Sequence, residues 1–285
     1  MRIGITGVTG LIGRRLAEEA SKQGHTVIGF SRKPASAASF DSPLRLLSNT
    51  EPVDVSGLDV LVHLAGEPPL GFWTEAKRRR IRDSRVLTTR HLVESLAARK
   101  DKPAVFLCAS GTDYYGNRGD EVLTESSSPG SGFLSEVAQD WEAEAMKASL
   151  LSIRTACLRL GLVLDDEQGI YPLMKRIFGL GLGAWMGSGR QYLPWIHVED
   201  AARLFLHVAE NQEISGPVNA VTPEPLTNRQ FSEALAASQG KKVHLAVPAW
   251  ALRVTLGDLS SIVLDSQRVV PTKALQSGYA FRKLC

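Results

Sequence analysis

Three glycines follow the first apolar run of the chain, which spans residues 2–6. They are Gly7, Gly10 and Gly13. Residues 11–23 then place their apolar side chains on one helical face, so the order predicts a strand, a tight turn and a helix. Gly7 would permit the turn, Gly10 would let the backbone approach a pyrophosphate, and Gly13 would allow close helix packing. Because amide groups at the start of a helix attract phosphates, the turn predicts a dinucleotide-binding loop. An ordinary glycine-rich turn is the alternative.

The end of the second apolar run, residues 26–30, bears on which dinucleotide would bind. Folds that select NAD place a carboxylate there to hold the ribose 2′-hydroxyl group. Here the run is followed by Ser31, Arg32 and Lys33, which offer a hydroxyl group and cations suited to a 2′-phosphate. We therefore expect NADP(H), with solvated loop charges at the two cations as the alternative.

A third buried run, residues 60–63, is followed by small residues. They would reach the carboxyl end of the sheet, where a nicotinamide ribose would lie, although a tight strand-to-helix turn is also compatible with them. The residues in question are Leu64, Ala65, Gly66 and Glu67. On the helix expected next, Arg78, Arg82 and Arg85 share one stripe. One of the three could turn inward to a phosphate while the others stay in water.

Apolar runs and amphipathic segments alternate through the first half of the chain. Strands are expected at 2–6, 26–30, 59–64, 104–109 and 151–160, and helices at 11–23, 74–98 and 134–148. This alternation predicts an α/β protein of the Rossmann type. Its doubly wound parallel sheet would be covered by helices on both faces.

The pattern changes after residue 164. Residues 169–189 contain six glycines, and prolines interrupt the helical segments after residue 223. We expect an NADP-binding domain at 1–164, to which 192–222 returns, and a smaller C-terminal substrate lobe made of 165–191 and 223–285. The substrate would lie between the lobe and the carboxyl edge of the sheet.

Composition and charge exclude several classes of protein. Lys and Arg (33) exceed Asp and Glu (30) by three charges spread along the chain, which does not favour a nucleic-acid partner. No leader and no apolar stretch of about 18 residues is present, so no membrane association is expected. Cys108, Cys157 and Cys285 form no CxxC pair, and the six histidines are scattered. We expect a cytoplasmic protein with a small-molecule substrate and no metal; the sequence leaves the oligomeric state open.

The sequence resembles the short-chain dehydrogenase/reductase superfamily, in its extended form that acts on sugar nucleotides. It is most similar to the atypical "epimerase family protein" group, which ends in an uncharacterised C-terminal domain. The shared motifs include Trp73 with Ser84-Arg85, Ser110 to Gly116, Trp141-Glu142, Arg159 to Gly161, Trp195 to Asp200, Gly216 to Ala220 and Gln267 to Pro271. The resemblance covers almost the whole chain and implies a Rossmann-type fold that binds NADP(H). Taken with the arguments above, it assigns the cofactor to Gly7, Thr9, Gly10, Leu11, Ile12, Gly13, Ser31, Arg32, Lys33, Leu64, Ala65, Gly66, Glu67 and Arg85.

The catalytic residues of that superfamily are only partly present. Its chemistry uses a Ser or Thr to hold the substrate oxygen, and a Tyr as acid/base with a Lys four residues later that lowers the tyrosine pKa. Ser110 can fill the first role, but residues 133–142, where the pair should lie, contain neither Tyr nor Lys. Tyr114 and Tyr115 are substitute phenols, one of which we expect to pack in the core, and Glu136 is a further alternative.

These observations predict an NADP(H)-dependent protein similar to epimerases and oxidoreductases. It would transfer a hydride at a carbonyl or carbinol carbon, with a nucleotide sugar as one candidate substrate. The rival hypothesis is a non-catalytic NADP(H)-binding sensor or scaffold, which the missing Tyr and Lys favour.

Overall fold

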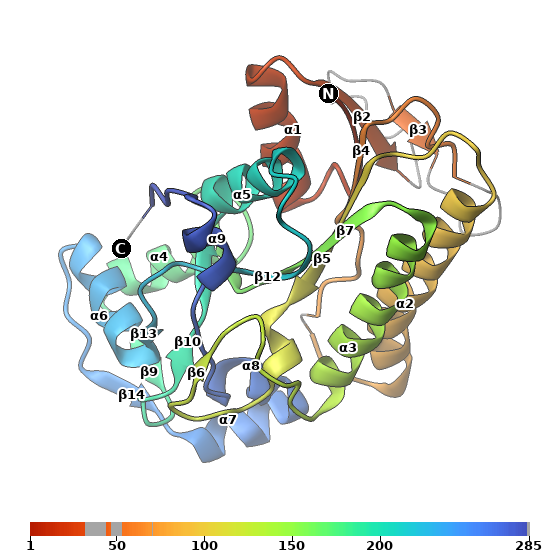
Figure 1. Ribbon diagram of the computed structural model, residues 1–285. Coiled ribbons are helices and arrows are strands. Elements are labelled where there is room, and N and C mark those ends of the chain that lie inside the picture. Colours follow the sequence, from red (N-terminus) through yellow and green to blue (C-terminus); the bar gives the residue numbers. More distant parts are fainter. Residues whose placement is uncertain (32–43, 47–52, 70, 284–285) are drawn as a thin grey trace.

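The computed structural model describes residues 1–31, 44–46, 53–69 and 71–283. Its centre is a seven-stranded sheet in which every pairing is parallel (Figure 1). The strands are β1 (Arg2–Thr6), β2 (Thr26–Ser31), β3 (Leu44–Leu46), β4 (Val60–His63), β5 (Val105–Gly111), β7 (Arg154–Leu160) and β12 (Gly216–Ala220). Their spatial order is β12-β7-β5-β4-β1-β2-β3, so the direction of winding reverses between β1 and β4.

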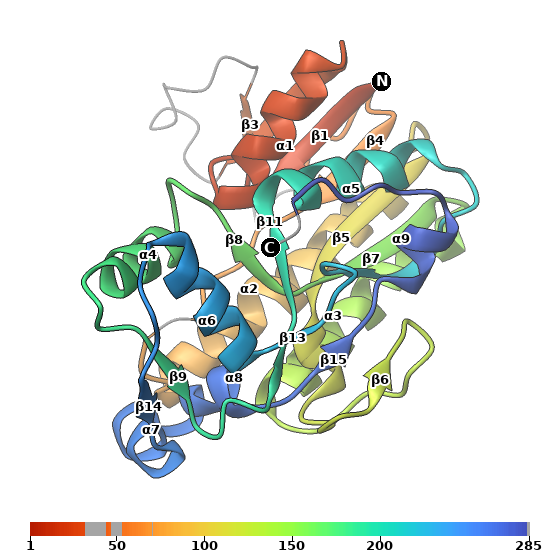
Figure 2. The ribbon, with the colours of Figure 1, turned by 90° about the vertical axis from the view of Figure 1, so that its left-hand side faces the viewer.

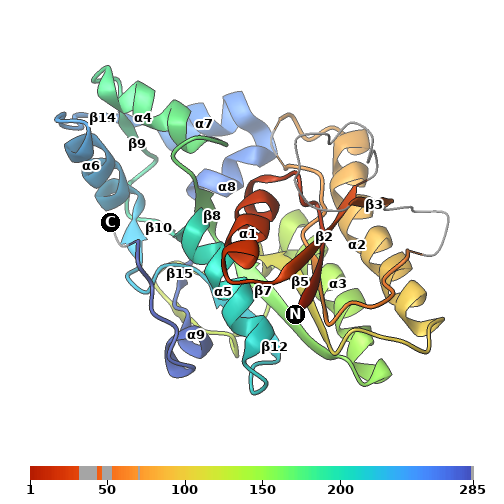
Figure 3. The ribbon, with the colours of Figure 1, turned by 90° about the horizontal axis from the view of Figure 1, so that it is seen from above.

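Helices cover both faces of this sheet. Helices α1 (Leu11–Lys22) and α5 (Val198–Glu210) pack together on one face, and α2 (Glu75–Ala97) and α3 (Phe133–Met146) pack on the other (Figure 3). The sheet is enclosed, and strands such as β4 are buried along their whole length, as expected for parallel strands covered on both sides. The predicted Rossmann-type α/β fold is confirmed.

A smaller group of elements lies beside the main sheet (Figure 2). Its helices are α4 (Tyr171–Gly179), α6 (Asn228–Ser238), α7 (Ala249–Leu256) and α8 (Ser261–Leu264). Helix α9 (Thr272–Gln276) packs instead on β12 of the main sheet, and its Ala274 belongs to the main core. Its short strands form the pairs β9 (Ala184–Met186) with β14 (Leu245–Val247), and β10 (Tyr192–Leu193) with β13 (Leu226–Thr227). A separate buried cluster that includes Phe178, Trp195 and Phe231 forms its core. The domain boundaries given above stay a prediction.

Two short strand pairs and the last described residues connect distant parts of the chain around the sheet. β8 (Leu162–Leu164) pairs with β11 (Trp195–His197), and β6 (Val122–Leu123) pairs with β15 (Arg268–Val269). The last described residues are held against α5, because the buried Asp200 carboxylate accepts the amides of Arg282 and Lys283. Segments far apart in sequence therefore meet near the carboxyl edge of the sheet.

Local chemistry explains where the observed elements differ from the expected ones. Helix α2 begins at Glu75, because the Thr74 hydroxyl accepts the Lys77 amide and caps the helix. Strand β7 begins at Arg154 and not at residue 151, because a 3-10 helix over Lys147–Leu151 precedes it. No helix in the described part of the chain is both long and apolar enough to cross a lipid bilayer.

Candidate functional site

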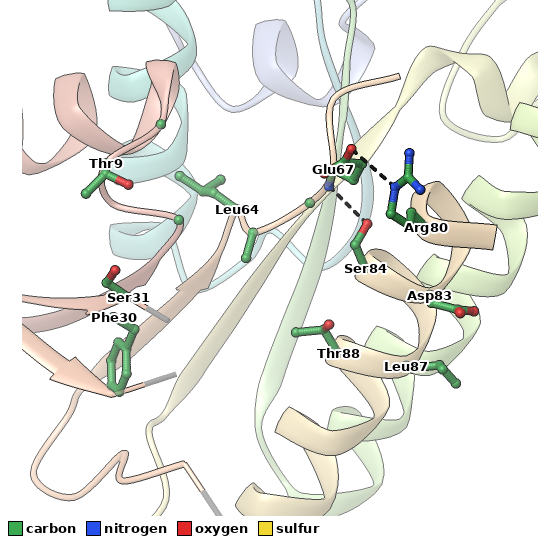
Figure 4. Close-up of a pocket in the computed structure, with 14 residues that line it drawn as sticks. Thr9, Phe30, Ser31, Leu64, Glu67, Arg80, Asp83, Ser84, Leu87 and Thr88 are labelled. Atoms are coloured by element: carbon green, nitrogen blue, oxygen red, sulfur yellow. Dashed lines mark hydrogen bonds and ion pairs between the residues drawn. The ribbon is translucent and has the colours of Figure 1, made fainter. Parts of the chain in front are cut away.

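A cleft of about 950 Å³ opens at the edge of the sheet where the winding reverses. In an open α/β sheet, this reversal is the place where ligands bind. Figure 4 shows Thr9 and Ser31 on one side of the cleft, and Asp83, Ser84 and Thr88 of α2 on the other. The full lining is Gly7, Thr9, Gly10, Phe30, Ser31, Leu64, Ala65, Gly66, Glu67, Arg80, Asp83, Ser84, Leu87 and Thr88.

The glycine turn forms the floor of this cleft between β1 and α1. Gly7 has a φ of +67°, a left-handed conformation that favours glycine. The Gly10 amide donates to the Gly7 carbonyl oxygen at 2.9 Å, and Gly10 provides no side-chain cap for α1. A Cβ atom on Gly13 would lie 2.3 Å from the Gly7 oxygen, so this glycine is required for packing. Gly7, Thr9 and Gly10 line the cleft; the other predicted residues of this motif, Leu11, Ile12 and Gly13, form the first positions of α1.

The end of β2 contributes Phe30 and Ser31 to the cleft. No carboxylate stands at Ser31, as the sequence indicated. Arg32 and Lys33, the two predicted cationic contacts, lie outside the described residues. Of the three residues expected to bind the 2′-phosphate, only Ser31 lies within the described part of the chain.

A buried threonine–histidine pair fixes the turn after β4. The Thr6 hydroxyl oxygen accepts the amides of Leu64 at 3.1 Å and Ala65 at 3.3 Å, and lies 2.7 Å from His63 Nδ1. Because that oxygen already accepts two amides, the hydroxyl proton is directed to Nδ1, which leaves the imidazole proton on Nε2. Burial, reinforced by the positive charge of Arg85, lowers the pKa of His63 from 6.5 to about 4. The pair is therefore neutral at physiological pH and holds the turn through hydrogen bonds alone.

Helix α2 clamps the same turn from the other side. Arg85 Nη1 donates to the Glu67 carbonyl oxygen at 2.8 Å, and its guanidinium lies 5.2 Å from the Trp141 ring centre. The Glu67 amide donates to Ser84 Oγ at 2.9 Å, and the Glu67 carboxylate pairs with Lys77 Nζ at 2.8 Å. Arg85 thus supports the turn from behind, and its direct contact with a cofactor stays a prediction.

The hydroxyl group of Ser110, at the end of β5, is engaged inside the protein. Ser110 is buried, and its Oγ donates to Glu142 Oε1 at 2.7 Å. Arg159 holds the same carboxylate with two bonds of 2.8 Å, from Nε to Oε1 and from Nη2 to Oε2. Because the only hydroxyl proton of Ser110 is directed to Glu142, its oxygen is left to accept a hydrogen bond and not to donate one.

Both candidate tyrosines pack around Arg159. The Tyr114 ring centre lies 3.4 Å from the Arg159 guanidinium carbon, and Tyr114 is half-buried. Tyr115 is fully buried; its hydroxyl group receives Arg159 Nη1 at 2.9 Å and donates to Asn219 Oδ1 at 2.7 Å. Burial raises the pKa of Tyr115 to about 12. The described bonds give Tyr115 a place in the core, and the acid/base role of either phenol stays a prediction.

Asp113 is a further candidate residue, which the sequence patterns alone did not single out. This residue lies on the 3-10 turn Thr112–Tyr115 that follows β5, three residues beyond Ser110. A Cβ atom on Gly111 would lie 2.9 Å from Asp113 Oδ2, so the carboxyl group folds back over the glycine at the strand end. A carboxylate directly after a central parallel strand is the signal that could have identified it. Within the ranges that the structure covers, no cluster of three or more His, Cys, Asp or Glu side chains could hold a metal ion.

Comparison with known proteins identifies the family. The model of the NAD dependent epimerase/dehydratase family matches residues 3–220, and that of a domain of unknown function, DUF1731, matches residues 247–283. The chain therefore belongs to the NAD dependent epimerase/dehydratase family, and the resemblance drawn from its motifs is confirmed.

Individual relatives cover the chain almost completely. The epimerase family protein YfhF of Bacillus subtilis is 35% identical over 285 residues, 99% of this chain and 94% of that protein. The crystal structure of the human epimerase family protein SDR39U1 with NADPH is 31% identical and has a TM-score of 0.87, covering 99% of this chain and 95% of the other. The nucleoside-diphosphate sugar epimerase from Corynebacterium glutamicum is 33% identical with a TM-score of 0.81, over 99% of this chain and 56% of the other.

The glycine turn offers a matched pair of substitutions. In Gly10→Ala the new Cβ would meet only the Gly7 oxygen at 3.1 Å, so we expect a folded protein whose NADPH affinity falls at least about tenfold. In Gly13→Ala the Cβ would collide with backbone atoms, and we expect a loss of about 1–3 kcal/mol in unfolding free energy. Urea denaturation and NADPH titration distinguish the two effects. Unchanged NADPH affinity in folded Gly10→Ala protein would contradict the assignment of the loop.

The buried His63 predicts a specific pH dependence of stability. Since its pKa falls from 6.5 to about 4 on folding, the unfolded chain binds a proton over this range that the folded chain does not. The unfolding free energy should therefore decrease as the pH falls from 6.5 to 4, by up to about 3 kcal/mol from this group.

Urea denaturation of the wild type and of His63→Gln at several pH values measures that contribution. The variant should lack this part of the decrease, whatever its stability at neutral pH. An equal loss in both proteins would show that His63 does not titrate as described.

Proposed function

We propose that the protein is an NADP(H)-dependent enzyme, similar to epimerases and oxidoreductases, that transfers a hydride at a carbonyl or carbinol carbon. A nucleotide sugar is one candidate substrate. The cleft at the reversal of the sheet carries this proposal, because a glycine turn, an uncapped helix start and the small residues after β4 line it together. Family membership and the NADPH in the human SDR39U1 structure support it.

The residues around the cleft fit a dinucleotide. The backbone at Gly7 and Gly10 would approach the pyrophosphate, and the first amides of α1 would attract its charge. Leu64, Ala65 and Gly66 would lie along the nicotinamide ribose. When bound, NADPH would supply the hydride, and the protein would position the substrate carbon.

The preference for NADP(H) over NAD(H) is part of the proposal. Ser31 stands where an acidic residue would hold a ribose hydroxyl group, and Arg32 and Lys33 follow it in the sequence. A planar guanidinium and an ammonium group suit a 2′-phosphate.

The substrate would lie between the domain at 1–164 with 192–222 and the lobe at 165–191 with 223–285. Because Ser110 donates its proton to Glu142, its oxygen can only accept a hydrogen bond from the substrate. It would therefore bind the hydroxyl group of a carbinol, which can donate, better than a carbonyl group, which cannot. Buried Cys108 and Cys157, which form no disulfide bond, support a cytoplasmic location. The proposed partner is a small molecule, and neither nucleic acid nor a membrane.

A non-catalytic NADP(H) sensor or scaffold is the second candidate function. One observation favours it: helix α3 carries neither Tyr nor Lys at the positions of the superfamily pair, and the ion pair of Glu142 with Arg159 lies beneath the end of β5. Cofactor binding without turnover would then order the second lobe for a partner.

The cofactor preference can be measured directly. Charged hydrogen bonds to a phosphate contribute about 1.5–3 kcal/mol, so NADPH should bind roughly ten to a hundred times more tightly than NADH. Ser31→Asp should abolish or reverse this ratio through charge repulsion, whereas Ser149→Asp, on an exposed residue of the 3-10 helix after α3, should leave it unchanged. Quenching of tryptophan fluorescence reports both affinities. Equal affinities in the wild type would contradict the NADP(H) preference.

Turnover is tested by single-turnover oxidation of bound NADPH. The probes are nitrobenzaldehyde and phenanthrenequinone, with UDP-glucose and NADP⁺ for the reverse direction. Because a positioned Tyr–Lys pair is missing, we expect rates lower by roughly 10²- to 10⁴-fold than those of enzymes that have one. Ser110→Ala and Tyr114→Phe identify the contributing group if the rate falls while NADPH affinity holds. Tight NADPH binding without any oxidation would favour the sensor.

A further inference from the structure

Asp113 lies where three parts of the chain meet. It follows β5 directly on the 3-10 turn, and its carboxyl group folds over Gly111, which has no side chain to occupy that place. Arg85 of α2 and Asp265, which follows α8, are the charged groups that act on it across this junction. The junction is at the carboxyl edge of the sheet, beside the turn at Gly66 that Arg85 contacts.

The position of Asp265 is fixed by bonds to the loop after Tyr115. The Ser266 amide donates to Asn117 Oδ1 at 3.1 Å, and Ser266 Oγ donates to the Gly119 carbonyl oxygen at 2.7 Å. The Arg118 amide in turn donates to the Ser266 carbonyl oxygen at 2.9 Å. These bonds hold the backbone next to Asp265 against the loop that follows Tyr115, and the Asp265 charge acts on Asp113 from this side.

Two other polar groups near the end of β5, Ser110 and Tyr115, are engaged, whereas the Tyr114 ring packs on Arg159. Ser110 donates its proton to Glu142, and the Tyr115 phenol is buried between Arg159 and Asn219. Glu142 itself is held by two bonds from Arg159 and by Ser110. The Asp113 carboxyl group has no hydrogen bond from another side chain in the described residues, and part of the residue's surface is accessible.

We propose that Asp113 exchanges the proton with the substrate oxygen, in place of the missing tyrosine and lysine. This assignment rests on the proposed function. In the reducing direction, the hydride adds to the carbonyl carbon, the C=O π electrons move to oxygen, and that oxygen takes the proton from the Asp113 carboxyl group. The products are the alcohol, the oxidised dinucleotide and the Asp113 carboxylate, which regains a proton from water.

The electrostatic surroundings suit a proton donor. Burial raises the pKa of Asp113, the charge of Asp265 raises it further, and Arg85 and the residue's own amide oppose the rise. The carboxyl group therefore keeps its proton at higher pH than an ordinary aspartate, closer to the pH at which an acid catalyst is effective. The reduction rate should fall as the pH rises through this pKa. Removal of the Asp265 charge should move the fall to lower pH.

Two measurements on NADPH-bound protein test the proposal. The first is a ¹³C NMR titration of protein labelled at its aspartate carboxyl carbons, with the Asp113 resonance identified by its absence in Asp113→Asn. We expect Asp113 to titrate above the ordinary value of about 3.9, and Asp265→Asn to lower its pKa. Titration of Asp113 at or below the ordinary value would overturn the proposal, and this readout does not depend on turnover.

The second measurement is the single-turnover rate with nitrobenzaldehyde and phenanthrenequinone. Asp113→Asn should lose roughly 10²-fold or more of the rate with unchanged NADPH affinity, whereas Asp120→Asn, an exposed carboxylate in the next loop, should retain it. Asp113→Glu should regain part of the rate and shift its pH profile. An unchanged rate in Asp113→Asn would overturn the assignment and leave the proposed function intact. Absence of oxidation in the wild type would overturn both.

Discussion

The buried ion pair between Glu142 and Arg159 connects the parts of the molecule around the candidate site. The two hydrogen bonds between these side chains join α3 to β7. Glu142 also accepts a hydrogen bond from Ser110 of β5, and Arg159 also donates one to the Tyr115 hydroxyl group in the following turn. Breaking a buried pair by removing one partner is costly because the other charge stays buried and unpaired. The pair therefore fixes the end of β5, and with it the direction in which Ser110 can form a hydrogen bond.

The same pair explains how this chain departs from the superfamily pattern. The Tyr–Lys relay of that pattern needs a phenol whose pKa is lowered by a nearby amine. Here the buried phenol, Tyr115, has its pKa raised by burial, and a guanidinium and a carboxylate lie beneath the strand end. The cleft proposed for the cofactor is formed by the glycine turn and the hydrogen-bonded turn after β4, which are separate from this network. A dinucleotide cleft can thus be kept while the proton chemistry moves to another group, for which Asp113 is our proposal.

Periodicity and glycine spacing were sufficient to predict five of the seven strands of the sheet, the helices α1, α2 and α3, and the glycine turn between β1 and α1, because these depend on local sequence. The short strand β3 and the edge strand β12 were not expected. The hydrogen bonds that engage the hydroxyl groups of Ser110 and Tyr115 could not be predicted, because their partners Glu142 and Asn219 are distant in the sequence. The position of Asp113 after a central strand could be recognised in the sequence, but its charged neighbours could not, because only the fold brings Arg85 and Asp265 to it.

A crystal structure of the protein with bound NADPH would show directly which groups hold the dinucleotide and which group faces its nicotinamide. We expect the pyrophosphate on the backbone of Gly10 at the start of α1, the adenosine 2′-phosphate beside Ser31, and the nicotinamide at the carboxyl end of β5 near the Asp113 carboxyl group. A dinucleotide bound outside this cleft would contradict the account of the site. A nicotinamide turned away from the end of β5 would contradict the chemistry proposed there.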